Sequence, residues 1–495
     1  MDRSGPSPWP FDCGSSPPVS SLLNPVRGLI VALGRGLVRL GWVSRATVDQ
    51  VSALAWPRML TGLARMSKAT ADVAMVGTAL GPAAIAGVGY GVPYWTMTFM
   101  IGGGIAGGTI SLVSQRYGGG REERIGVAVT VSAGLALAAT LPLVVVFGLV
   151  PEPLIRLIGY GEAAVQYGTD YLRVACLAMP FSALNLVASR ALIGANDAWT
   201  PMVVRAGGAV VNVALNAVLI FGFGLGVVGA ALGTVVGSVG SLAVFLWGLW
   251  RGRLPGVGPL PFRLSVAEPL WDEADARHLL RISSPLALRK IAQNGGQFPM
   301  LAIVGLFGAE VVAAYVVALR VRALMNTPGW GFGLASSSLV GQALGEGDEQ
   351  AAAVYARETL RFTMAAFATV AVLVFAAAPG IAPLFVSAPE TLGVTVTLLR
   401  ATCVSVLLWG IMTGGMGPLR ASGDTQWPFY GQTLGLLAFA LPAAYLGATT
   451  AVGLWGLAAA LVLETGVPAA VIYYRYSTKA WMRIGRDYRS AALGG

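Results

Sequence analysis

The stretch SLVSQRYGGGRE, residues 111–122, returns as SLVGQALGEGDE, residues 338–349, 227 positions further along the chain. Seven of the twelve positions are identical, and chance rarely gives such agreement at a fixed offset. Other residues recur at the same offset: Arg173 and Cys176 as Arg400 and Cys403, Asp197 and Pro201 as Asp424 and Pro428, and Gly226 and Gly229 as Gly453 and Gly456. The sequence therefore predicts two copies of one structural unit.

The composition places both copies in a lipid bilayer. Of the 495 residues, 55% are hydrophobic and only 11% are charged, and the mean hydropathy is +0.70. Such a chain has too little polar surface for a soluble globule of this length. The net charge of +10 is also compatible with nucleic-acid binding. Because the basic residues cluster in short loops, we expect no nucleic-acid partner.

Twelve segments are predicted to cross the membrane as helices, since a span needs about 20 mainly apolar residues. The first copy supplies residues 52–79, 83–113, 125–149, 164–192, 201–224 and 226–250. The second copy supplies residues 282–306, 311–341, 358–386, 391–418, 428–447 and 450–475. An even number of spans in each copy makes the copies parallel. The predicted fold is an all-α integral membrane protein with two parallel six-helix bundles.

The orientation follows from the positions of arginine and lysine, which gather before the first span, after the second, between the copies and at the C-terminal end. We therefore expect a multi-pass protein of the plasma membrane with both termini in the cytoplasm. Residues 26–43 alternate apolar residues with arginines, which suits an amphipathic helix on the anionic inner leaflet; the alternative is a disordered tail. The predicted organisation is an N-terminal cytoplasmic segment (1–50), a first bundle (51–252), a cytoplasmic linker (253–280), a second bundle (281–476) and a basic tail (477–495).

Asp72 is the first candidate functional residue. It lies near the end of the first span with apolar sequence on both sides, and a carboxylate at mid-bilayer costs roughly 2.5 to 3.5 kcal/mol. Such a group usually faces a cavity, where it binds or relays an ion. Lys68 lies one helical turn earlier, so the alternative is a static ion pair.

Three polar residues of the fifth and sixth spans extend this candidate site. Asn212 and Asn216 are four residues apart on one helical face, and Thr234 follows in the next span. With Asp72 they supply one carboxylate, two amides and a hydroxyl, which suits a proton or, with backbone carbonyls, a sodium ion. The alternative is that these three residues only join helices by hydrogen bonds.

Pro57 precedes Asp72 by about four turns of the same predicted helix, and Pro285 has a similar place in the second copy. A proline inside a helix removes one backbone hydrogen bond and bends the helix. Pro57 is therefore a candidate hinge whose state depends on the charge of Asp72. The alternative is a fixed kink that serves only packing.

The second copy has no counterpart of Asp72, because Gln297 and its neighbours occupy that region. Its candidates for the wall of a substrate cavity are Gln297, Arg320, Arg322 and Glu464. The two arginines could instead extend to the membrane interface, and Glu464 could pair with one of them. Glu464 is also a candidate second proton site.

Catalysis by this chain is not expected, and neither is a cofactor. The three cysteines form no CxxC pair, and His278 is the only histidine. Two GxGxxG patterns, at 102–107 and 224–229, do not follow a predicted strand, so they do not match a dinucleotide site. No GK[ST] sequence is present, which excludes transport driven by ATP hydrolysis in this chain.

Four motifs occur in order in the first copy. They are AWP at 55–57 with ADVAMVG at 71–77, SLVSQ at 111–115 with the glycine-rich turn after it, the segment 194–201, and Asn212 with Asn216 before LIFG at 219–222, completed by Thr234. Together they resemble the signatures of the multidrug and toxic compound extrusion (MATE) family. The resemblance covers about residues 50 to 475.

The resemblance implies two bundles related by a pseudo-twofold axis along the membrane normal. It also implies secondary active export of cationic or amphipathic compounds, such as drugs or toxic organic cations, by alternating access in exchange for protons or sodium. Asp72, Asn212 and Thr234 would then form the ion site, and for sodium they would be its ligands. Asn216 departs from the pattern, because many relatives have Asp there, which leaves Asp72 as the only formal negative charge. We expect a monomer in contact with membrane lipid.

A flippase for a lipid-linked oligosaccharide, of the related polysaccharide exporter type, is the alternative function. Arg289, Lys290, Arg320 and Arg322 favour it, since a diphosphate needs positive charge. A major-facilitator carrier is disfavoured, because its acidic-basic signature is missing after the second span. An intramembrane enzyme or a scaffold is disfavoured because no nucleophile and base pair is visible.

Overall fold

The computed structural model describes residues 24–158, 161–264, 269–385 and 389–493. The first half contains α1 (Asn24–Arg39), α2 (Arg45–Leu80), α3 (Pro82–Gly118), η2 (Glu122–Arg124), α4 (Ile125–Leu149), α5 (Pro151–Ile158), α6 (Glu162–Ala175), η3 (Cys176–Ala178), α7 (Met179–Gly194), α8 (Trp199–Ala217), the π-helix η4 (Val218–Gly222) and α9 (Gly226–Arg251). Two short antiparallel strands, β1 (Arg253–Leu254) and β2 (Gly258–Pro259), begin the linker.

The second half repeats this order. It contains α10 (Glu273–Gly295), α11 (Gln297–Gly305), α12 (Ala309–Met325), α13 (Thr327–Glu346), α14 (Glu349–Ile381), η5 (Ala382–Leu384), α15 (Pro389–Ser422), α16 (Gln426–Leu434), the π-helix η6 (Gly435–Ala440), α17 (Leu441–Thr449), α18 (Leu454–Ser477) and α19 (Ala480–Leu493). The protein is therefore an all-α membrane protein with two six-helix bundles.

Two of the twelve predicted spans differ in composition from the others. Among the described residues, nine helices are long and apolar enough to cross a membrane, or ten if the bent pair α12 and α13 forms one span. The remaining two spans are α2 and the pair α10 and α11, which lead the two halves and carry several charged residues. Their charges lower the apolarity of these helices, and many of them lie inside the molecule.

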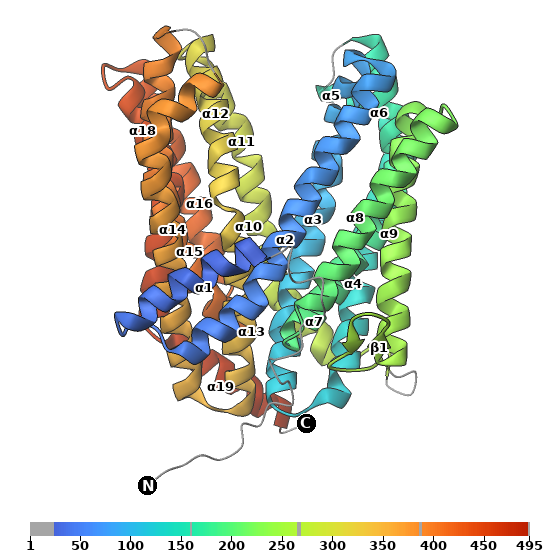
Figure 1. The fold of residues 1–495 in the computed structure, drawn as a ribbon, viewed down its shortest axis with the longest axis vertical. Helices are drawn as coiled ribbons and strands as arrows, with labels where there is room; N and C mark the ends of the chain where they lie inside the picture. Colours follow the sequence, from blue (N-terminus) through green and yellow to red (C-terminus); the bar gives the residue numbers. More distant parts are fainter. Residues whose placement is uncertain (1–23, 159–160, 265–268, 386–388, 494–495) are drawn as a thin grey trace.

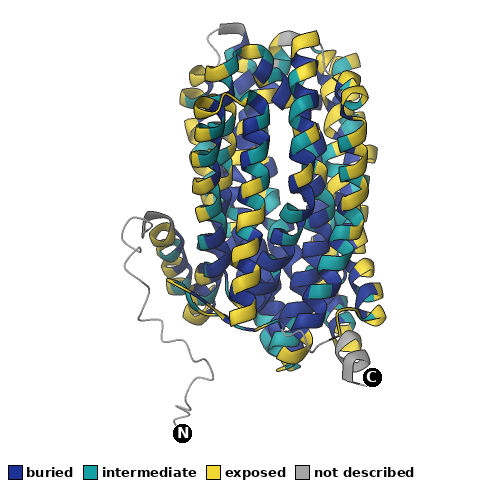
Figure 2. Cartoon of the chain, turned by 90° about the vertical axis from the view of Figure 1, so that its right-hand side faces the viewer, coloured by how far each residue is buried: buried dark blue, intermediate teal, exposed yellow. Residues whose placement is uncertain are grey.

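The outer surface of the long helices is suited to lipid. Figure 2 shows exposed residues along the outer sides of the helices and buried residues between them. Many of the exposed side chains are large and apolar; Val210 is 70% exposed and Val372 is 67% exposed. In water this surface would be costly, whereas in a bilayer it contacts acyl chains.

The two halves meet at one end and diverge at the other. In Figure 1 they converge at the lower end, where α19 lies. A Cβ atom on Gly118 would lie 2.0 Å from the carbonyl oxygen of Gln342, and one on Gly345 would lie 2.0 Å from that of Gln115. The repeated glycines therefore let the two copies of one motif touch backbone to backbone.

Hydrogen bonds across this contact are reciprocal. Gln115 Nε2 donates to the carbonyl oxygen of Ala421 at 2.5 Å, and Gln342 Nε2 donates to that of Gly194 at 3.0 Å. Each glutamine thus binds the end of a helix in the other half. The repeated motif closes one end of the molecule.

The leading helix of each half begins in the core of the other half. Val51 and Leu54 of α2 are buried with Phe332 and Phe362 of the second half. In the same way, Leu279 and Ile282 of α10 pack in the core of the first half. Both helices start before the predicted spans, at residues 45 and 273 rather than 52 and 282. Each leading helix therefore links the two bundles.

The helix α1 is amphipathic, as predicted for residues 26–43, although it ends at Arg39. Ile30 and Leu37 are buried against the start of α2, whereas Arg27 and Arg35 are exposed. The loop after α1 is held to α14, because the backbone N–H and the hydroxyl of Ser44 both donate to Glu358 Oε2. This segment therefore packs on the second half.

Candidate functional site

A cavity of about 320 Å³ lies between the two halves. Helices α2, α3 and α7 of the first half and α10, α13 and α15 of the second half contribute to its wall. The closed end of the molecule and the divergence of the helices above it place this space at the interface between the repeats. This is the position that the duplication predicts for a substrate site.

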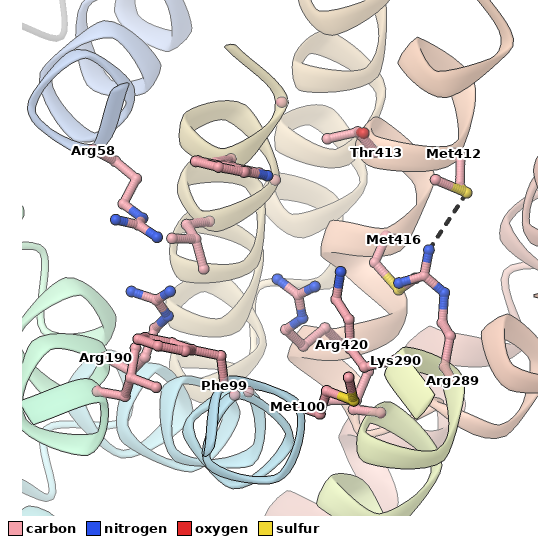
Figure 3. Close-up of a pocket in the computed structure, with 18 of the residues that line it drawn as sticks. Arg58, Phe99, Met100, Arg190, Arg289, Lys290, Met412, Thr413, Met416 and Arg420 are labelled. Carbon is pink, nitrogen blue, oxygen red and sulfur yellow. Dashed lines mark hydrogen bonds between the residues drawn. The ribbon is translucent and has the colours of Figure 1, made fainter. Parts of the chain in front are cut away.

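The wall of the cavity is positively charged. Arginine and lysine side chains from both halves extend into it, whereas no aspartate or glutamate lines it within the described part of the chain (Figure 3). The basic residues of the wall are Arg58, Arg65, Arg190, Arg289, Lys290 and Arg420.

Several of these groups are buried without a partner. Within the described ranges, Arg58 Nε, Arg289 Nε, Arg420 Nε and one terminal nitrogen of Arg190 are inaccessible and make no hydrogen bond. Arg289 as a whole is only 7% exposed. A charge in this position is costly unless something binds it. The cavity wall therefore contains several buried hydrogen-bond donors that have no acceptor in the described structure.

Aromatic and sulfur-containing side chains form the rest of the wall. The guanidinium of Arg65 lies 4.8 Å from the ring centre of Trp330 and 5.7 Å from that of Phe99. One nitrogen of Arg289 lies 3.5 Å from Met412 Sδ. Such contacts hold cations in place without neutralising them.

Asp72 lies in a second site, within the first half. Its Oδ2 atom lies 2.7 Å from Lys68 Nζ, and its Oδ1 atom accepts a hydrogen bond of 2.7 Å from Asn216 Nδ2. The same amide nitrogen of Asn216 donates to Asn212 Oδ1 at 3.3 Å, and Lys68 Nζ lies 3.5 Å from Thr234 Oγ1. The structure thus brings together Asp72, Asn212, Asn216 and, through Lys68, Thr234.

In this structure Lys68 supplies the cation of the Asp72 site. Its ammonium contacts the carboxylate and the hydroxyl that would coordinate a sodium ion. Side-chain exposures of 22% for Lys68 and 19% for Asp72 show that the pair is partly accessible. An ion that binds here must displace or replace the ammonium.

The four cavity candidates of the second half need correction, because none of them lines the cavity in the described structure. Arg322 and Glu464 form a buried ion pair of 2.8 Å between α12 and α18. Arg320 lies two residues earlier, which is about 200° around the helix, and is exposed. Gln297 is exposed at the start of α11.

Sequence reasoning missed Arg58, Arg65, Arg190 and Arg420 as cavity residues. The first three lie inside predicted spans, so the argument applied to Asp72, that a charge in a span marks a functional site, would have found them. Arg420 follows the predicted end of its span at residue 418, and α15 extends beyond it to Ser422. Arg289 and Lys290 do line the cavity.

Pro57 is buried inside α2, immediately before Arg58, and Pro285 is buried inside α10. Residues on both sides of Pro57 contact the second half, since Ala55 lies against Gly331 and Gly62 lies beneath Trp330. The proline therefore lies where α2 crosses between the halves.

A comparison with known families agrees with this architecture. The family model described as MatE matches residues 57–218 and, again, residues 285–446. The chain belongs to the MatE family. The two matches correspond to the two halves of the structure, so this chain contains two MatE units.

Individual MatE relatives cover nearly the whole chain. A curated relative, "Probable multidrug resistance protein NorM" of Bradyrhizobium diazoefficiens, is 28% identical over 446 residues, which are 87% of this chain and 93% of the relative. A solved multidrug resistance MATE family transporter in an outward-facing conformation has a TM-score of 0.75 at 23% identity and covers 90% of this chain and 96% of its own.

A second solved structure is a MOP superfamily transporter from Pyrococcus furiosus, for which a reverse polarity of the binding pocket suggests a different function. It has a TM-score of 0.79 at 22% identity and covers 89% of this chain and 98% of its own. At this identity both structures show that the fold is shared.

Proposed function

We propose that this MatE protein is a secondary active efflux transporter that exchanges amphipathic small molecules for protons or sodium ions. The observation that supports it is the partly buried Asp72 carboxylate, held by Asn216 and Lys68 in the helix that also lines the central cavity. The names of the relatives as multidrug resistance proteins support small drug-like molecules as substrates.

The coupling ion enters the Asp72 site from outside in this proposal. A cation that moves inward across a potential of 100 mV releases about 2.3 kcal/mol. Because Lys68 already neutralises the carboxylate, the proton or sodium ion competes with its ammonium. Lys68 therefore sets how strongly the site holds the ion.

The helix α2 connects this site to the cavity. Asp72 and the cavity residue Arg58 lie on one continuous helix, about 21 Å apart along its axis. Pro57 weakens the helix next to Arg58, so a change of charge at Asp72 can alter the position of this wall. Coupling requires that ion and substrate favour different states.

The orientation completes the proposal. With both termini in the cytoplasm of a cell, as the basic loops predict, the closed end of the molecule faces the cytoplasm. The halves then diverge toward the outside, and the structure represents the state that releases substrate and takes up the ion.

The proposal is tested with purified protein in liposomes, with proton and sodium gradients imposed separately. We expect Asp72→Asn to reduce gradient-driven transport of a fluorescent amphipathic compound at least tenfold. We expect Lys68→Gln to keep transport and to lower the ion concentration for half-maximal rate about fivefold, since a partly exposed ion pair contributes about 1 kcal/mol. Undiminished gradient-driven transport by Asp72→Asn would rule out this coupling site.

The charge of the cavity wall is relevant to the class of substrate and to the alternative function as a flippase. Cationic drugs, which the family resemblance implies, find no carboxylate in the described wall. Arg289 and Lys290, which favour a flippase for a phosphorylated lipid, line the cavity, whereas Arg320 and Arg322 do not. The flippase therefore remains a second candidate.

A further inference from the structure

We propose that the central cavity binds an amphipathic organic anion, with a carboxylate, sulfonate or phosphate group attached to an apolar ring or chain. This inference rests on the proposed function only in treating the central cavity as the transport site. It names a substrate charge opposite to that of the cations implied by the family resemblance.

The cavity wall lacks negative charge in the described part of the chain. Arginine stays protonated in proteins, so the arginines of the wall cannot become neutral. Arg58 is repelled by Arg190 and Arg65, which line the same cavity, and by Arg205. An anion in the cavity replaces this repulsion with attraction, whereas a cation adds to it.

The basic residues of the wall also have unused hydrogen-bond donors. Arg289 is more than nine-tenths buried, and its Nε–H has no acceptor in the described structure. Arg58, Arg190 and Arg420 each have a buried nitrogen in the same condition. Guanidinium groups bind carboxylate, sulfonate or phosphate oxygens with two parallel hydrogen bonds, so these donors match the proposed ligand.

The apolar part of the wall explains why the anion is amphipathic. Phe99, Trp330, Trp409, Met412 and Met416 line the same cavity as the basic residues. A volume of about 320 Å³ suits a small organic molecule. Inorganic phosphate alone would make no apolar contact with these aromatic and methionine side chains.

The carboxylates of Asp72 and Glu464 do not compete for this role. Asp72 is paired with Lys68, and Glu464 is paired with Arg322. Neither acid lines the cavity. The positive charge of the wall is therefore available to a ligand.

The basic residues form two groups that belong to different halves. Figure 3 shows Arg58 and Arg190 on one side, and Arg420, Lys290 and Arg289 on the other. An anion between them attracts both halves and stabilises the state in which the groups are close. Export of such an anion and entry of a cation are each equivalent to positive charge moving inward. The two movements add, so the exchange is electrogenic.

Binding to the full-length protein in lipid nanodiscs tests the inference without any ion gradient. The probes are fluorescein, which is anionic at mildly alkaline pH, and rhodamine 6G, a cation with the same ring system. We expect fluorescein to bind in preference to rhodamine 6G. We expect Arg289→Gln and Arg420→Gln each to weaken fluorescein binding at least tenfold. We expect Arg420→Lys to weaken it less, because lysine keeps the positive charge but loses the paired hydrogen bonds of the guanidinium.

Arg320→Gln is the matched control, because it removes an exposed cation of the same half that lies outside the cavity. It should leave fluorescein binding unchanged. Tighter binding of rhodamine 6G than of fluorescein would overturn the inference, and so would fluorescein binding that is indifferent to both glutamine variants.

A short-chain phosphatidic acid distinguishes the source of the anion. If it displaces fluorescein and binds more tightly, the ligand is a lipid phosphate; if it does not, the ligand is a free organic anion. Either result supports anion recognition by this wall. Because binding is measured without a gradient, failure of anion binding and failure of coupling at Asp72 are separate results.

Discussion

Charged side chains inside this protein differ in whether the chain supplies their counter-charge. Lys68 and Asp72 neutralise each other, as do Arg322 and Glu464. The cavity arginines have no acidic partner in the described residues. Only this last group leaves its charge for a ligand.

His278 is a single side chain whose burial links its charge to the stability of the fold. It lies in α10 near the ion pair of Arg116 and Asp275. The pKa of His278 is lowered to about 4, mainly by burial; Asp275 raises it, whereas Arg116 and Arg281 lower it. The folded protein therefore keeps this imidazole neutral at neutral pH.

The pH dependence follows from the sign of this shift. The unfolded chain takes up a proton at His278 below about pH 6.5, whereas the folded chain does so only near pH 4. Stability is therefore lost as the pH falls between these values. At about pH 5 the native protein should lose on the order of 1 to 2 kcal/mol of its free energy of unfolding through His278, and we expect His278→Gln not to show this loss. Thermal unfolding in detergent from neutral to acidic pH measures it, and identical pH profiles for the two proteins would contradict it.

The helix α2 takes part in three features of the molecule: the contact between the halves, the cavity wall and the Asp72 site. Its N-terminal end packs in the second half, its middle lines the cavity and its C-terminal end carries Asp72. Pro57 lacks an N–H group, so the carbonyl of Ala53 loses its helical hydrogen bond at the crossing point.

Pro57→Ala tests whether this defect acts as a hinge. The substitution restores one hydrogen bond, so we expect unchanged or higher thermal stability together with a severalfold lower rate of exchange in liposomes. Pro285→Ala is the matched control, because α10 has a buried proline but no ion site. A hinge role is refuted if both variants slow exchange equally or if neither does.

The molecule as a whole is closed at one end by two copies of one motif. Gly118 and Gly345 fit against backbone atoms of the opposite half, with no room for a methyl group. This contact must separate if the protein is to open at the end where α19 lies. In the proposed transport cycle, this close packing would favour the state that is closed at this end.

Gly345→Ala should push the halves apart at this end and destabilise the observed state by about 1 to 3 kcal/mol. Access to the cavity is measured with a single cysteine, Thr413→Cys, in the cavity wall of a protein whose native cysteines have been replaced. This protein is treated with a membrane-impermeant thiol reagent from either side. We expect the variant to gain labelling from the side of α19. Gly305→Ala, where a Cβ meets no atom within 4 Å, is the control. Equal labelling in both variants would refute this role of the contact.

The sequence alone determined the architecture of this protein. Apolar runs of spanning length, a constant repeat offset and basic loops are local properties, so they predicted the twelve spans and the two bundles. The grouping of Asp72, Asn212 and Asn216 was also predicted from sequence, because residues four apart share a helical face and a lone acid stands out in an apolar run.

Which charges meet depends on how the helices pack. Arg322 and Glu464 lie 142 residues apart, and their pairing depends on how α12 packs against α18. The cavity arginines come from helices of both halves, so no local pattern shows that they converge. Side-chain direction over such separations is fixed by packing between helices, and this packing makes the cavity positive while it removes the predicted candidates from it.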